Sequence, residues 1–174
     1  MNDHAAVIDA SFFLGAFLSE FCNDEEKNAR DYISKIIQNN GQIYVPQLFW
    51  FEIGNVLTNA VKPKKDGSSG RLSLPQFLTV YQNIRELPIY TDPQPDSETQ
   101  LRISNLAVQY NLTFYDASYL ELAIRTSLPL KTFDRKLLQY YNQDYIAKLE
   151  KSIKQTKTGF AAEKKLEELR EMEK

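Results

Sequence analysis

Cysteine and histidine are nearly absent from this chain of 174 residues, which contains one of each, Cys22 and His4. A single cysteine excludes an internal disulfide framework and a zinc ribbon built from CxxC pairs. A single histidine beside the N-terminus argues against Ser-His-Asp or Cys-His catalysis and against a histidine-rich zinc site. If the protein is an enzyme, we expect carboxylates to carry its chemistry.

Long hydrophobic runs are also missing. The longest, Phe12 to Leu18, has seven residues, whereas a membrane-spanning helix needs about 20. The residues before this run include Asp3 and Asp9 but no lysine or arginine, unlike the basic start of a secretory signal. We therefore expect a cytoplasmic protein with no membrane segment.

Charge is nearly balanced overall but unevenly distributed. The chain has 21 basic and 23 acidic residues, a formal net charge of −2, and 43% hydrophobic residues, which is the composition of a globular domain. Residues 147–174 contain eight basic and six acidic side chains and only a thin apolar stripe. We predict a folded domain over residues 1–146 and a charged helical C-terminal extension over residues 147–174.

Short apolar runs alternate with helical patterns along the predicted domain. Strands are predicted at residues 5–8, 43–45, 87–90 and 129–131, with a possible fifth at 145–146, and helices at 12–22, 24–39, 49–60, 74–85, 97–110, 114–125 and 134–141. Ser11 and Ser73 are predicted helix caps, and residues 62–70 form a polar loop. This alternation predicts an α/β fold of three α/β/α layers around a mainly parallel sheet of four to five strands.

Four acidic residues lie where this fold places ligand sites, at the carboxyl ends of the strands. Asp9 and Asp134 each follow a strand, while Glu52 and Asp116 lie in early turns of helices that start at the same edge. Each has a structural alternative. Asp9 and Asp134 are placed to cap helices, Thr113 and Asp116 have the capping-box spacing, and Glu52 shares a polar helix side with Asn55 and Asn59.

Taken together, the four carboxylates indicate a metal site. Four ionised carboxylates gathered in a low dielectric repel one another, so such a cluster holds protons or divalent cations. Oxygen ligands without histidine or thiolate suit Mg²⁺ or Mn²⁺. The reaction favoured by such a site is metal-assisted hydrolysis of a phosphodiester.

The sequence resembles the PIN-domain ribonucleases, and in particular the VapC-like toxins of bacterial toxin–antitoxin pairs. The resemblance covers most of residues 5–140 and is carried, in order, by VIDAS, PxLxxxExxNVL, YDASYLxLA and LxTFDRKL. It implies that Asp9, Glu52, Asp116 and Asp134 are the acidic quartet that binds Mg²⁺ or Mn²⁺, with Asp9 and Asp116 as direct ligands. It also implies supporting roles for Ser11, Asn55 and Thr132, although Ser11 and Thr132 are equally suited to capping helices.

The same resemblance implies the reaction and the partners. An activated water would attack an RNA phosphate in line and leave a 3′-hydroxyl and a 5′-phosphate. The partners would be an RNA substrate, a cognate antitoxin and a second copy of the chain in a homodimer. Three features depart from the family pattern: a long basic loop at residues 62–70, Lys131 before the threonine, and the C-terminal extension.

RNA binding requires local positive charge because the predicted domain is itself acidic. Two basic clusters are candidates for holding a backbone phosphate, one around the polar loop (Lys62, Lys64, Lys65 and Arg71) and one around Asp134 (Lys131, Arg135 and Lys136). Two other functions remain open. One is a catalytically inactive PIN scaffold that binds RNA or protein; the other, ranked last, is a haloacid-dehalogenase-like phosphatase, which expects an aspartate where Ser11 stands.

Overall fold

A four-stranded parallel sheet forms the centre of the molecule. The computed structural model describes residues 4–18, 23–65, 67–143 and 147. The strands lie in the order β3-β2-β1-β4, and every neighbouring pair is parallel. In chain order the elements are β1 (Ala5–Ile8), α1 (Ala10–Leu18), α2 (Asp24–Gln38), β2 (Gln42–Val45), α3 (Leu48–Val61), α4 (Leu74–Arg85), β3 (Ile89–Thr91), α5 (Ser97–Tyr110), α6 (Phe114–Thr126) and β4 (Leu130–Lys131), followed by a helical segment at 135–143.

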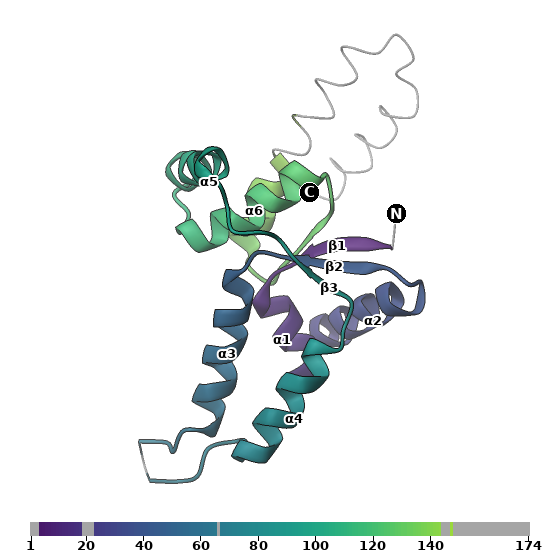
Figure 1. Cartoon of the computed structure of the whole chain (residues 1–174), viewed down its shortest axis with the longest axis vertical. Coiled ribbons are helices and arrows are strands. Elements are labelled where there is room, and N and C mark those ends of the chain that lie inside the picture. The colour runs from purple at the N-terminus through teal and green to yellow at the C-terminus, as the bar shows by residue number, and fades with distance from the viewer. Residues whose placement is uncertain (1–3, 19–22, 66, 144–146, 148–174) are drawn as a thin grey trace.

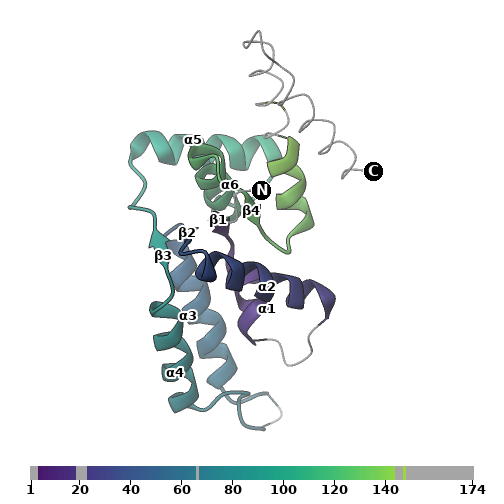
Figure 2. The same ribbon diagram turned by 90° about the vertical axis from the view of Figure 1, so that its right-hand side faces the viewer.

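Helices cover both faces of this sheet. Figures 1 and 2 show α5 and α6 on one side of the strands and α1 and α2 on the other. The strand segment Ala6–Ile8 is fully buried between these layers, as a parallel sheet covered on both faces requires. The predicted three-layer α/β fold with a parallel sheet is confirmed.

Local sequence signals explain where most helices begin. Ser73 caps α4 in a reciprocal capping box with Gln76, with proline in the first turn. Asn23 and Glu26 form the same box at the start of α2. The side-chain oxygen of Asp96 accepts from the Thr99 backbone N–H at the start of α5.

Several boundaries differ from the sequence predictions. The prediction that Ser11 caps the first helix is wrong, because α1 already begins at Ala10 and the Phe12 N–H bonds to Asp9 Oδ1 instead. The third strand, β3, begins two residues later than predicted. Pro88 has no backbone N–H to donate, and β3 pairs with β2 from Ile89 on. The predicted strand at 145–146 lies outside the described residues, as does the predicted C-terminal extension apart from Ala147.

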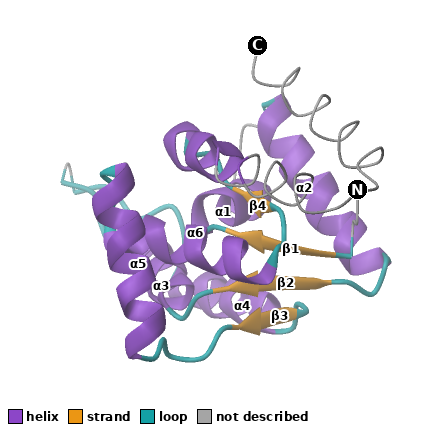
Figure 3. Ribbon diagram, turned by 90° about the horizontal axis from the view of Figure 1, so that it is seen from above, coloured by secondary structure: helices purple, strands orange, loops and turns teal. Residues whose placement is uncertain are grey.

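Helices α3 and α4 form an antiparallel pair that runs away from the sheet. In both side views the two helices lie next to each other, and the connection between them lies at the end remote from the strands (Figures 1 and 2). Seen from above, the strands point their carboxyl ends toward α3 and α5 (Figure 3). The N-terminal end of α3, with Glu52 in its second turn, therefore lies beside the carboxyl edge of the sheet.

Candidate active site

Asp9 and Thr132 meet at the carboxyl edge because β1 and β4 are neighbours. Ile8 pairs with Lys131, and the Asp9 backbone N–H donates to the Lys131 carbonyl at 3.0 Å. This register places the next residue of each strand side by side, and Thr132 Oγ1 donates to Asp9 Oδ2 at 2.5 Å. Both side chains are buried, with 7% of each residue exposed.

The other oxygen of Asp9 is also hydrogen-bonded. Asp9 Oδ1 accepts from the Ser11 hydroxyl at 2.6 Å and from the Phe12 backbone N–H at 2.9 Å. The carboxylate thus caps α1 and is held in one orientation by hydroxyls from two chain segments. Each oxygen of a carboxylate has about two acceptor positions, so these bonds orient Asp9 without using all of its lone pairs.

Asp134 is connected to Asp9 through the same threonine. The Asp134 backbone N–H donates to Thr132 Oγ1 at 2.9 Å. Its own Oδ1 accepts from the backbone N–H groups of Lys136 and Leu137 at 2.8 and 3.0 Å, which makes it the cap of the helical segment 135–143. Asp134 is exposed. It therefore caps the helical segment and lies at the solvent-facing rim of the site.

Glu52 reaches the site from α3. Its Oε2 accepts a 2.5 Å hydrogen bond from the hydroxyl of Tyr119, a residue only 2% exposed. Burial raises the pKa of Glu52, the Tyr119 bond opposes this, and the negative charges of Asp9 and Asp116 raise the pKa further. Burial, followed by the Glu52 charge, raises the pKa of Tyr119, so the phenol remains a donor.

Asp116 is held near the start of α6 by Thr113. The Thr113 hydroxyl accepts from the Asp116 backbone N–H at 3.0 Å and donates to Asp116 Oδ2 at 2.7 Å. Thr113 is therefore the helix cap, as its spacing predicted, while the Asp116 carboxylate does not bond back to the Thr113 backbone as in a full capping box. Asp116 is half-exposed.

Two carboxylates are close enough to influence a third, since the charges of Asp9 and Asp116 both act on Glu52. Among the described residues, no group of three or more acidic, histidine or cysteine side chains is arranged to hold one metal ion directly. Mg²⁺ normally takes one or two carboxylates and completes its shell with water and phosphate. The donor set is compatible with a hydrated ion of this kind, because it consists of oxygen atoms only.

Two of the proposed supporting residues lie where the sequence placed them, and the third does not contact an acid. Ser11 and Thr132 bond directly to Asp9. Asn55 is exposed on α3, and its side-chain oxygen accepts from the Asn59 amide at 3.4 Å. Sequence reasoning missed Tyr119, although its position three residues after Asp116 on α6 places it on the same side of that helix.

The two basic clusters differ in how far their side chains are already engaged. Lys131 lies over the Tyr32 ring at 4.5 Å, and Lys136 Nζ donates to the Asn111 carbonyl at 2.6 Å. Arg135 is exposed beside them. In the other cluster, Lys62 Nζ donates to Asn59 Oδ1 at 3.0 Å. Most of the cations near Asp134 therefore have structural contacts.

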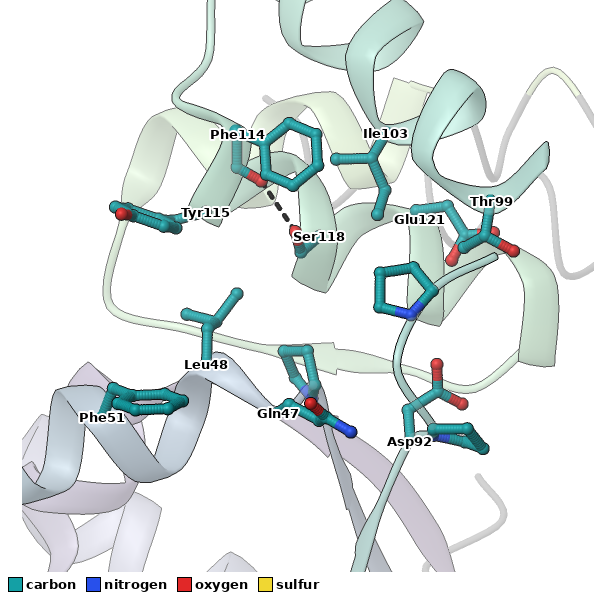
Figure 4. Close-up of a pocket in the computed structure, with 13 residues that line it drawn as sticks. Gln47, Leu48, Phe51, Asp92, Thr99, Ile103, Phe114, Tyr115, Ser118 and Glu121 are labelled. Carbon is teal, nitrogen blue, oxygen red and sulfur yellow. Dashed lines mark hydrogen bonds between the residues drawn. The ribbon is translucent and has the colours of Figure 1, made fainter. Parts of the chain in front are cut away.

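A pocket of about 290 Å³ lies beside the acidic residues. Its lining comes from the segments that follow β2 and β3, from the first turns of α3, and from α5 and α6. It includes Phe51 and Tyr115, the sequence neighbours of Glu52 and Asp116. Figure 4 shows Phe51 and Tyr115 at one end of the pocket and Thr99, Glu121 and Asp92 at the other. None of the four carboxylates of the predicted quartet lines this pocket, so it is a neighbouring feature of the same edge.

One buried carboxylate that the sequence reasoning did not single out is structural. Glu121, 3% exposed, accepts from Arg102 Nε at 3.0 Å and from Arg125 Nε at 3.1 Å. Arg125 also reaches Asp92 at 2.7 Å. The cluster ties α5 and α6 to the segment after β3, and the paired arginines compensate the buried charge.

Comparison with known proteins identifies the family. The model of the PIN domain family matches residues 6–143. The chain belongs to the PIN domain family, whose members are generally nucleases that use divalent metal ions. No curated protein matches the chain.

A solved structure agrees with this fold. The crystal structure of PAE2754 from Pyrobaculum aerophilum is similar over 79% of this chain and 85% of that one, with a TM-score of 0.50 and 23% sequence identity. A likeness at this identity concerns the fold alone.

Among the described residues, no helix is both long and apolar enough to cross a membrane.

Proposed function

We propose that this PIN-domain protein is an endoribonuclease that hydrolyses RNA phosphodiester bonds with Mg²⁺ or Mn²⁺. The observation that carries the proposal is that Asp9 and Asp116 both lie close enough to Glu52, at the carboxyl edge of the sheet, for their charges to raise its pKa. A cation relieves this repulsion. With one histidine in the chain, at its N-terminus, an acid–base mechanism based on imidazole is disfavoured.

The roles of the residues follow from their contacts. Asp9, buried and oriented by Ser11 and Thr132, and Asp116, held by Thr113, are the proposed direct ligands of the ion. Glu52 and Asp134, one half-buried and one exposed, are proposed to position water at the substrate phosphate. A bound divalent ion supplies charge stabilisation at the phosphate and makes the attacking water more acidic.

The test is RNA cleavage by the full chain. Purified protein with Mn²⁺ should cut total RNA at discrete sites, and Asp116→Asn, which keeps the size of the side chain, should reduce the rate at least 100-fold, about the loss seen when one electrostatic contributor is removed. Asp31→Asn is the matched control, because Asp31 is exposed on α2, outside the site. Full activity of Asp116→Asn, or unchanged cleavage in EDTA, would overturn the proposal.

We also propose that the enzyme is the toxin of a toxin–antitoxin pair and forms a homodimer. Exposed apolar side chains beside the site support the existence of protein partners, with Phe51 79% and Tyr115 63% exposed. Expression of the wild-type chain should arrest growth, and co-expression of a small protein encoded beside it should relieve the arrest. Arrest by Asp116→Asn equal to that of the wild type would contradict a toxin role based on cleavage.

An inactive scaffold that binds RNA or protein is the second candidate. The observation that favours it is that Asp9 and Asp134 both cap helices, while no described group of three such side chains is arranged around one ion. Calorimetric titration with Mn²⁺ separates the two functions, since a scaffold has no need of the metal. Absence of binding together with intact RNA affinity would favour the scaffold.

A further inference from the structure

A polar stripe leads along α3 from the active site to the far end of the helix. Glu52, Asn55, Asn59 and Lys62 follow one another at spacings of three, four and three residues, which places them on one side of the helix. The side chains of the last three are joined by hydrogen bonds. Lys62 Nζ donates to Asn59 Oδ1 at 3.0 Å, and the Asn59 amide donates to Asn55 Oδ1 at 3.4 Å.

The stripe ends at the strongest concentration of positive charge in the described part of the chain. Residues 62–71 contain four basic side chains and one acidic one, a net charge of +3 in a chain whose total is −2. Lys64, Lys65 and Arg71 are exposed. Within the described residues, the salt bridges involve none of these side chains.

The backbone of this basic loop is folded against the helix end. The Lys64 N–H donates to the Ser68 carbonyl at 2.9 Å, and the Gly67 N–H donates back to the Lys64 carbonyl at 3.0 Å. At Gly70 a Cβ atom would lie only 2.3 Å from the Val61 carbonyl oxygen, so the chain approaches α3 as closely as glycine permits. The loop therefore presents its lysines from a defined position at the end of the stripe.

We propose that a single RNA strand lies along this side of α3, with its scissile phosphate at the acidic residues and two more distant phosphates at Lys64 and Lys65 of the basic loop. The proposal rests on the proposed ribonuclease function. Ten residues separate Glu52 from Lys62, which is about 15 Å of helix. A stacked strand carries one phosphate per about 3.4 Å, so the interval corresponds to about four nucleotides.

The chemistry of the stripe suits this ligand. Lysines supply the charge that a polyanion requires, and residues 62–71 carry a net charge of +3. The side-chain amides of Asn55 and Asn59 can donate to phosphate oxygens and accept from 2′-hydroxyl groups between the two ends. The cluster around Asp134 is less suited, because Lys136 is bonded to the Asn111 carbonyl.

The test is the salt dependence of RNA binding by the full chain in EDTA, where hydrolysis is suppressed. The probe is a labelled single-stranded RNA of about 16 nucleotides, the upper end of common site sizes. The variant Lys64→Ala with Lys65→Ala should reduce the slope of log K against log salt by about 1.4, which is 0.7 for each lost phosphate contact. The control Lys27→Ala with Lys35→Ala removes the same charge from exposed positions on α2 and should leave the slope unchanged.

A second variant examines the middle of the stripe. Asn59→Asp places a negative charge beside the proposed strand and should weaken binding severalfold, whereas Asn28→Asp, an exposed position on α2, should not. Equal slopes in the two double variants, or equal affinities in the two asparagine variants, would overturn the proposed path. Cleavage of the same RNA with Mn²⁺ is measured in parallel. If the RNA is cleaved but the slopes do not change, the proposed path is wrong and the ribonuclease function stands. If the slope changes as predicted but no cleavage occurs, the ribonuclease function is wrong.

Discussion

Thr132 and Asp9, 123 positions apart in sequence, are joined by a 2.5 Å hydrogen bond from the threonine hydroxyl to Asp9 Oδ2. The same hydroxyl accepts from the Asp134 backbone N–H at 2.9 Å. The Thr132 side chain therefore orients both the Asp9 carboxylate and the backbone of Asp134. Because both partners are backbone-anchored at the ends of neighbouring strands, the arrangement depends on the sheet register.

Replacement of Thr132 tests this bridge. Thr132→Val keeps the shape but leaves the Asp134 N–H and Asp9 Oδ2 without their partner, so we expect the free energy of unfolding to fall by about 1–3 kcal/mol and cleavage to decrease. Thr132→Ser keeps the hydroxyl and should retain most of both. Urea denaturation and a cleavage assay measure the two effects, and a valine variant as active as the serine variant would show that the bridge does not position Asp9.

Metal binding should be visible as stabilisation, independently of activity. A ligand that binds only the folded state stabilises it by about 2.7 kcal/mol at 100 times its Kd. We therefore expect Mn²⁺ to raise the melting temperature of the wild type and of Asp31→Asn, but not that of Asp9→Asn. Asparagine at position 9 can still accept the Phe12 N–H bond, so the variant should fold. An equal shift in all three proteins would place the ion elsewhere.

The raised pKa of Glu52 predicts how stability depends on pH without metal. The folded state holds this proton more tightly than the unfolded state, whose carboxyl titrates near its ordinary value of 4.5. The contribution of Glu52 to the free energy of unfolding is therefore fully present below pH 4.5. It is lost as the pH rises from there through the higher folded pKa. Glu52→Gln, which can still accept from Tyr119, should remove this decline and make the protein more stable at neutral pH but less active.

The measurement for Glu52→Gln is thermal denaturation in EDTA across the acidic range, beside the wild type. The difference in melting temperature should grow with pH and then level off above the folded pKa. A constant difference at all pH values would show that burial and the charges of Asp9 and Asp116 do not penalise the ionised glutamate.

The buried Glu121 cluster is expected to be important for stability rather than chemistry. Glu121→Gln removes the charge that both Arg102 and Arg125 approach, and we expect the loss of charged hydrogen bonds to cost about 1.5–3 kcal/mol. Glu98→Gln is the matched control, because Glu98 also bonds Arg102 but its side chain is 83% exposed. Chemical denaturation compares the two; equal small losses would contradict a special role for the buried carboxylate.

Local patterns were sufficient for much of the fold. The cap at Ser73 predicted the start of α4, and the apolar run at residues 5–8 predicted β1 at its observed bounds. These predictions succeeded because caps and buried strands depend on neighbours within a few residues. Ser11 was assigned wrongly as a cap because Asp9 and Ser11 both carry suitable oxygens, and only the backbone geometry decides between them.

The sequence named candidate site residues one by one but not their arrangement in space. Strand-end positions and motif order singled out Asp9 and Asp116, whereas nothing in the local sequence connected Glu52 with Tyr119, which lie 67 positions apart. The roles of Lys131 and Lys136 were also undecided in sequence, and their contacts with Tyr32 and Asn111 come from other elements.

By itself, the sequence determined an α/β domain that is nearly devoid of histidine and cysteine and has acids at its strand ends, since composition and residue order are properties of the linear chain. Only the tertiary structure decided the strand order β3-β2-β1-β4, the hydrogen bonds that hold Asp9 and Glu52, and the course of the polar stripe on α3 toward the basic loop. The physical reason is that hydrogen bonds and charge interactions depend on distance in space. Register and packing set that distance for residues far apart in the chain.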